Sequence, residues 1–90
     1  MRLDRYLFFI RLLKSRTQAQ ALLEQGRTRL DGRRVEKVSE TVRVGATITL
    51  PLGGAIRVIR VVSLPLRRGP APEARACYEE LGVDGGDGPA

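Results

Sequence analysis

The side chains through which this sequence could do chemistry are mainly cationic. Its 90 residues include 16 lysines and arginines against 10 aspartates and glutamates, a formal net charge of +6 at pH 7. Guanidinium and ammonium groups bind phosphate oxygens by charge-assisted hydrogen bonds, so a cluster of them indicates a polyanionic partner, either nucleic acid or an anionic membrane. The candidates for such contacts are Arg2, Lys14, Arg16, Gln20, Arg27, Arg29, Arg33, Arg34 and Lys37.

Composition excludes several other chemistries. There is no histidine for acid–base catalysis or metal binding, and the single Cys77 supplies neither an internal disulfide nor a thiolate zinc site. We expect Cys77 to be a small buried hydrophobe. Asp4, Asp31 and Glu36 could in principle do carboxylate chemistry, but helix-start capping, turn formation and solvated pairing account for them better. We therefore expect no catalytic residue, no bound metal and no cofactor.

The positive charge is concentrated in the first three quarters of the chain. Residues 1–68 hold 15 basic and 5 acidic residues, a balance of +10, whereas residues 69–90 hold 1 arginine and 5 acids, a balance of −4. A charge that serves only solubility would also explain a basic surface. The positions that the predicted helices and strands give to the cations therefore have to decide between a surface that binds a polyanion and a charge that serves only solubility.

A first helix is predicted over about residues 3–13. Apolar residues recur three and four positions apart along this segment, as they do on the buried stripe of an amphipathic helix. Phe8 and Phe9 widen the stripe, and we expect them to pack in the core rather than to stack on a base.

A second helix is predicted over about residues 16–25, almost without a linker, so that the two helices cross steeply. Ser15 and Gln18 have the spacing of a capping box, and Gly26 suits the left-handed position that ends a helix. Lys14 and Arg16 then stand at the start of this helix, where free amides and the helix dipole attract phosphate. We expect Arg16 to be exposed and to make no contact with the core.

A β-hairpin follows the second helix directly. Alternation turns Thr28 and Leu30 inward and Arg27 and Arg29 outward, and Asp31-Gly32 is a strong signal for a tight turn. The turn region adds the cations Arg33, Arg34 and Lys37. Cations that converge from a helix start and a hairpin suit a folded phosphate backbone, and do not resemble one helix lying in a major groove.

The rest of the chain predicts two more strands and a short helix. Residues 42–50 alternate, with Val42, Val44, Ala46, Ile48 and Leu50 on one face. A turn over 51–55 leads to a strand over 56–62. Arg57 and Arg60 fall on opposite faces of this strand, so we expect a bulge or a strand end there. We treat these two arginines as solvated. A helix over 73–81 would place Ala74, Cys77, Tyr78 and Leu81 on one stripe.

The order and spacing of these residues resemble the ribosomal-protein-S-four-type RNA-binding domain over about residues 2–50. The matching positions are Arg2-Leu3-Asp4, Ser15-Arg16, Ala19, Leu22, Gly26, Leu30-Asp31-Gly32, Val35, Lys37, Ser39 and Val44-Gly45. The resemblance implies an α+β fold in which two N-terminal helices pack on a small, mostly antiparallel sheet, the alpha-L motif that grips structured RNA. We expect this domain over 1–66, a short C-terminal extension with a helix over 67–82, and a disordered tail over 83–90.

Two segments also resemble the bacterial ribosome-associated heat-shock protein fifteen family and its small ribosome-quality-control relatives. They are residues 2–8 and residues 67–74 together with Tyr78-Glu79-Glu80. The resemblance implies a non-catalytic protein of the heat shock response that binds ribosomal RNA and tRNA on free large ribosomal subunits still holding peptidyl-tRNA after aborted translation. We expect a cytoplasmic protein, since no apolar run could span a bilayer and no signal peptide is recognisable. We also expect it to be a monomer away from the ribosome.

Several alternatives remain open. The chain could be a general structured-RNA binder or a ribosome-assembly factor, and DNA binding is possible. An enzyme is disfavoured because 90 residues leave no room for the catalytic domains that accompany S-four-type domains elsewhere. The basic, amphipathic first helix would suit an anionic membrane, but the hairpin arginines have no role there. Arg2 could pair with Asp4 or Glu24 instead of RNA, and the hairpin cations could form a solvated face.

Overall fold

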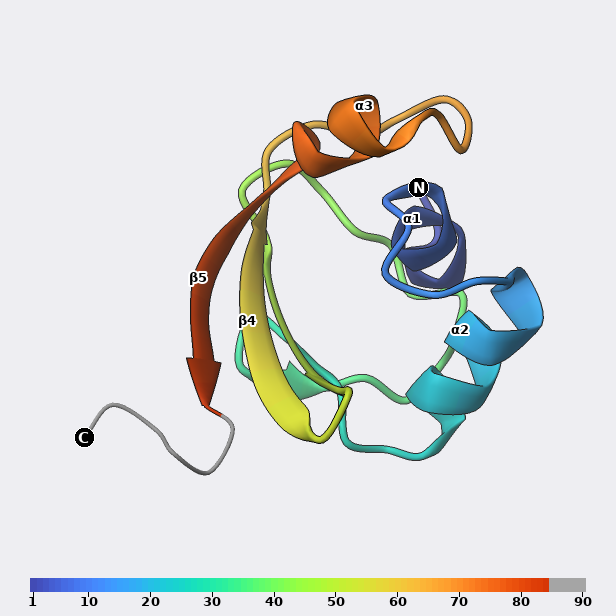
Figure 1. Ribbon diagram of the computed structural model, residues 1–90. Helices are drawn as coiled ribbons and strands as arrows, with labels where there is room; N and C mark the ends of the chain where they lie inside the picture. The colour runs from blue at the N-terminus through green and yellow to red at the C-terminus, as the bar shows by residue number, and fades with distance from the viewer. Residues whose placement is uncertain (85–90) are drawn as a thin grey trace.

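Two N-terminal helices lie against one face of a curved antiparallel sheet in the computed structural model, which describes residues 1–84 (Figure 1). The helices are α1 (Leu3–Phe9), α2 (Arg16–Glu24) and the short α3 (Ala71–Arg75). The strands are β1 (Arg29–Leu30), β2 (Arg33–Arg34), β3 (Thr47–Leu52), β4 (Ala55–Val61) and β5 (Tyr78–Asp84). They form one sheet in the order β2-β1-β3-β4-β5. This arrangement confirms the predicted α+β class.

Helix α1 is shorter than the predicted 3–13. It ends at Phe9, and Arg11 adopts a left-handed conformation with φ of 65°. Two donors bind the carbonyl of Phe8 at this helix end: the amide of Arg11 and the guanidinium of Arg68, which also donates to the carbonyl of Leu13 in the following loop at 3.1 Å. A side chain that is distant in sequence therefore binds a carbonyl at the helix end.

Helix α2 forms as its local signals predict. The amide of Gln18 donates to the Ser15 hydroxyl at 3.0 Å, which confirms the cap. The Gln18 side chain reaches back as expected, but its oxygen accepts from the amide of Lys14 rather than that of Ser15. Gly26 follows the helix with φ of 76°, in the left-handed region that a residue without a Cβ adopts most easily.

The predicted hairpin is β1–β2. Asp31 and Gly32 have φ of 52° and 85°, the pair of positive values that a type I′ turn requires. The amide of Thr47 donates to the Asp31 carboxylate at 2.9 Å, which ties the turn to β3. Thr28 and Leu30 are buried while Arg27 and Arg29 are exposed, as alternation predicts.

The strand predicted over 42–50 begins only at Thr47. The amide of Val42 donates to the Met1 carbonyl, and Thr41 bridges to Arg2, so the backbone before β3 pairs with the N-terminus instead. Val44 consequently lies outside the core and is 61% exposed. The turn is narrower than 51–55, because Gly53 and Gly54 suffice, and the predicted bulge occurs between Val58 and Ile59 opposite β5.

The predicted helix over 73–81 is wrong in its second half. Helix α3 ends at Arg75, and the chain continues as β5, which pairs along the whole of β4. A free edge of β4 offers a full ladder of backbone hydrogen bonds, which outweighs the weak helical spacing of a short segment. Leu81 is 41% exposed as a result. Of the tail predicted over 83–90, residues 83 and 84 belong to β5, and residues 85–90 lie outside the described part of the chain.

The hydrophobic core lies between the two helices and the sheet. Its largest fully buried side chains include Tyr6, whose hydroxyl donates to the carbonyl of Cys77 at 2.8 Å. Cys77 is itself buried, as predicted. Phe8 and Phe9 are only half-buried, against expectation, and the guanidinium groups of Arg68 and Arg5 lie over their rings at 4.4 and 5.8 Å from the centroids.

Candidate nucleic-acid interface

Three of the nine predicted contact residues meet at the carboxylate of Asp4. Arg2 donates to both oxygens of Asp4, from Nε and Nη2, each at 3.1 Å. Gln20 donates from α2 to Oδ2 at 2.9 Å, and Nη2 of Arg16 lies 3.6 Å from the same oxygen. The packing of α2 against α1 thus gathers Arg2, Arg16 and Gln20 around one acid, and we call these four residues the Asp4 cluster.

Asp4 is ionised although it is fully buried. Burial by itself would raise the pKa of its carboxyl group, but hydrogen bonds from Gln20, Arg2 and the Arg5 amide hold that pKa below the ordinary value of 3.8. The sequence-based alternative of an Arg2–Asp4 ion pair is therefore realised. The expectation that Arg16 makes no contact with the interior is wrong, although its side chain is 44% exposed.

The loop after the hairpin, which carries Lys37, lies against the start of α1. The amides of Leu3 and Asp4 donate to the carbonyls of Glu40 and Val38, so residues 36–41 cover the start of α1. Lys37 is exposed on this loop, and Lys14 is exposed just before α2. Within residues 1–84, neither lysine forms an ion pair.

The hairpin cations differ from one another in their partners. Arg33 forms an exposed ion pair with Glu40 at 2.9 Å, and Arg29 donates to the Gly32 carbonyl at 3.3 Å. Arg34 packs its guanidinium over Gly26, where an added Cβ would meet its Nη2 at 2.6 Å. The hairpin is therefore linked to the end of α2, and β1 and β2 place Arg29 opposite Arg34. Arg27 lies apart from this group, in a cleft beside the β3–β4 turn.

The arginines of β4 form ion pairs with acids of β5, while the side chain of Arg60 stays 51% exposed, as the expectation of a solvated residue requires. Arg57 donates to Glu80, and Arg60 pairs with Glu79 at 3.2 Å. The hydrogen bond that Arg57 donates to the Glu80 carboxylate raises the pKa of the guanidinium despite its partial burial. Because β5 supplies these acids, the excess of positive charge on the described residues shifts toward α2 and the hairpin.

Two arginines that sequence reasoning left out have structural roles. Arg68 donates to the carbonyls of Phe8 in α1 and Leu13 in the loop after it, and Arg11 donates through Nε to the Gly69 carbonyl at 2.7 Å. These reciprocal contacts join the 67–69 segment to α1. No local pattern could have revealed them, because the partners are more than fifty residues apart.

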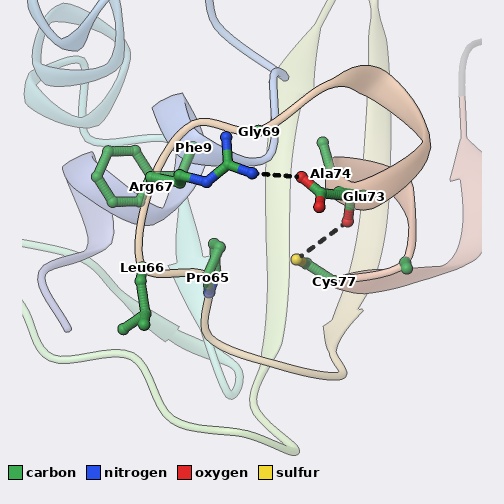
Figure 2. Close-up of a pocket in the computed structure, with 9 residues that line it drawn as sticks. Phe9, Pro65, Leu66, Arg67, Gly69, Glu73, Ala74 and Cys77 are labelled. Atoms are coloured by element: carbon green, nitrogen blue, oxygen red, sulfur yellow. Dashed lines mark hydrogen bonds and ion pairs between the residues drawn. The ribbon is translucent and has the colours of Figure 1, made fainter.

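An apolar pocket of about 360 Å³ lies between the end of α1 and the segment that leads into α3. Figure 2 shows Phe9, Pro65 and Leu66 at this pocket, with Arg67 bonded to Glu73 across it. Since its cation is already paired with an acid at 3.3 Å, the pocket adds no net charge to the basic surface.

Other kinds of site are absent from the part of the chain that the structure describes. Within residues 1–84, no three histidine, cysteine or acidic residues are grouped closely enough to hold a metal ion. Over the same residues, every helix is too short to cross a bilayer.

Comparison with known proteins finds a family and several relatives that match this chain. The model of the S4 domain family matches residues 1–48. The chain is 38% identical over 80 residues to the heat shock protein 15 homolog of Haemophilus influenzae and to heat shock protein 15 of Escherichia coli K12. These matches cover 89% of this chain but only 60% and 59% of the two relatives, so the chain spans about three fifths of their length.

Two further relatives match larger shares of their own length. The RQC P-site tRNA stabilizing factor of Bacillus subtilis is 36% identical over 64 residues, which cover 71% of this chain and 73% of that protein. A solved structure of heat shock protein 15 from Vibrio cholerae, described as trimeric, superposes with a TM-score of 0.84 at 36% identity, and covers 90% of this chain and 81% of its own. The chain therefore belongs to the S4 domain family of RNA-binding proteins, as a homologue of heat shock protein 15.

Proposed function

We propose that this protein binds ribosomal RNA, tRNA or both on the large ribosomal subunit, and that it acts on free large subunits that hold peptidyl-tRNA after aborted translation. Support comes from its relatives: several are named heat shock protein 15, and another is named for stabilising the P-site tRNA. We place this activity in the bacterial cytoplasm, on a protein that is a monomer away from the ribosome.

One structural observation carries the proposal: Lys14 just before α2, Arg29 and Arg34 on the hairpin and Lys37 on the loop at 36–41 have no acidic partner among the described residues. Among the described residues, the cations of β4 are paired with Glu79 and Glu80, whereas Lys14, Arg34 and Lys37 have no ion pair. A charge that served only solubility would not need this separation. The proposed contact residues are those of the sequence-based prediction: Arg2, Lys14, Arg16, Gln20, Arg27, Arg29, Arg33, Arg34 and Lys37.

The proposal is tested by binding of labelled protein to purified bacterial large ribosomal subunits at several salt concentrations. If five to seven cations contact phosphate, the logarithm of the affinity should fall by about 0.7–0.9 per contact for each log unit of salt. A nearly flat salt dependence would remove the electrostatic surface from the proposal.

A pair of double variants locates the interface. Lys14→Gln with Lys37→Gln removes two exposed charges from the proposed surface, and we expect affinity to fall at least about tenfold. Arg60→Gln with Arg75→Gln removes two exposed charges outside that surface and should change affinity less than about threefold. Equal losses in the two proteins would show that the interface lies elsewhere.

The ribosomal state is tested separately. Large subunits carrying a P-site tRNA should bind the protein more tightly than empty ones, by about tenfold or more if tRNA contributes charge-assisted hydrogen bonds. Equal affinity for the two preparations would instead favour a general structured-RNA binder or an assembly factor.

A further inference from the structure

We propose that Asp4 is a positioning residue for RNA binding: its buried carboxylate holds Arg2, Arg16 and Gln20 in place so that their outward groups are set for phosphate before RNA arrives. The inference rests on the proposed function. It assigns a positioning role in RNA binding to an acidic residue, although the negative charge of an acid by itself opposes the binding of RNA.

The solvent exposure of the side chains in the Asp4 cluster supports a role for Asp4 in holding the arginines and a role for the arginines in contacting phosphate. The side chain of Asp4 is 0% exposed, whereas those of Arg2 and Arg16 are 45% and 44% exposed. The carboxylate therefore cannot come into contact with a phosphate, while each guanidinium still presents part of its surface to solvent. A guanidinium has five N–H donors in a rigid fork, so the two that Arg2 gives to Asp4 leave others for a second acceptor.

The arrangement also leaves a positive charge at the surface. Two guanidinium groups face one carboxylate, so the Asp4 cluster keeps a net charge of about one unit from these three residues. Both oxygens are occupied, since Oδ1 accepts from Arg2 and the Arg5 amide and Oδ2 accepts from Arg2 and Gln20. Such saturation keeps the carboxylate ionised although it is buried.

Holding the arginines has an energetic advantage for recognition. Long cationic side chains lose rotamer freedom when they bind, and that loss opposes association. Here part of the loss is already incurred on folding, because the bidentate contact with Asp4 fixes the Arg2 guanidinium. If Asp4 positions the arginines, its removal should weaken the binding of RNA. If only the net charge matters, its removal should strengthen that binding.

The test is the affinity of Asp4→Asn for purified bacterial large-subunit ribosomal RNA, measured by fluorescence anisotropy. The control is Glu79→Gln, which raises the net charge by the same unit at an exposed ion pair on β5. We expect Asp4→Asn to bind at least about tenfold more weakly than the unaltered protein, and Glu79→Gln to bind equally well or slightly more tightly. Affinity of the Asp4→Asn protein equal to that of the control, with its fold intact by circular dichroism, would overturn the proposal.

A purely structural role for Asp4 would lower the free energy of unfolding without changing the affinity of the folded fraction, so the affinity is the decisive readout. Should Asp4→Asn fail to fold, nitrogen-15 NMR of the unaltered protein decides instead. The Nε–H of Arg2 should exchange with solvent much more slowly than that of Arg27, which has no ion pair among the described residues. Equal exchange rates would show that the arginine is not held, and would overturn the proposal.

Failure of the proposed function gives a different pattern of results. An unaltered protein that binds neither ribosomal RNA nor large ribosomal subunits, with or without a P-site tRNA, would refute the proposed function, whatever the NMR shows. Binding by the unaltered protein that is undiminished in Asp4→Asn would refute only the positioning role.

Discussion

Replacement of Arg68 by methionine should destabilise the fold more than any other change of a charged side chain in the C-terminal segment. Arg68 donates to the carbonyls of Phe8 and Leu13 and lies 4.4 Å over the Phe8 ring. Methionine keeps the aliphatic length of the side chain but cannot donate to either carbonyl. The change therefore isolates the guanidinium contacts that end α1.

The expected loss can be worked out from these contacts. Each hydrogen bond contributes about 0.5–1.5 kcal/mol net, and a cation over an aromatic ring at a partly exposed site contributes about 0.5–1 kcal/mol. Two hydrogen bonds and one ring contact sum to about 1.5–4 kcal/mol. For a domain of this size the urea m-value is about 1 kcal/mol/M, so the unfolding midpoint should fall by about 1.5 M or more.

The neighbouring arginine provides the control. Arg67 pairs with Glu73 through side chains that are 70% and 59% exposed, and such surface pairs contribute little. Urea unfolding followed by circular dichroism should therefore show Arg67→Met close to the unaltered protein and Arg68→Met well below it. If the two variants unfold at the same urea concentration, Arg68 does not hold α1 and the argument fails.

Three further predictions follow from local geometry and are checked by urea unfolding. Ser15→Ala should lower the free energy of unfolding by about 1 kcal/mol through loss of the cap on α2, and an unchanged midpoint would contradict this role. Gly26→Val should lower it by more than about 1–2 kcal/mol, because a β-branched residue resists φ of 76° and its Cβ would displace Arg34; a stable variant would mean that the helix end is misplaced. Because the pKa of Asp4 is depressed on folding, its ionised form stabilises the protein above pH 3.8, and this stability should be lost as the pH falls through the lower folded pKa. The decline in acid should be shallower in Asp4→Asn, and identical pH profiles would refute the assignment.

The elements that could be predicted from the sequence are those decided by nearby residues. The cap at Ser15, the glycine at 26 and the turn at 31–32 each depend on backbone conformations within a few positions, and each formed as predicted. The length of α1 could not be predicted in this way. Its end depends on Arg68, which reaches it from a distant part of the chain.

In the C-terminal segment, helix formation competes with strand pairing, and the local sequence pattern does not predict which of the two forms. Residues 73–81 carry a helical spacing, but the backbone from Tyr78 onward pairs with β4 once that edge is available. In the candidate interface, the Arg2–Asp4 pair was visible as two nearby residues of opposite charge. The contacts of Arg16 and Gln20 with the same carboxylate could not be predicted, because they depend on how α2 packs against α1.

The ion pairs between β4 and β5 bear on how the molecule approaches a polyanion. In the sheet, β2 and β5 are opposite edges, and β5 brings Glu79 and Glu80 to the arginines of its neighbour. At the other edge, Arg29 and Arg34 have no acid partner within residues 1–84. The domain thus carries an electric dipole that runs across its sheet. In the field of an RNA, this dipole exerts a torque that turns the hairpin edge forward before any contact is made. More encounters then begin in a productive orientation, so the arrangement raises the rate of association, most strongly at low ionic strength.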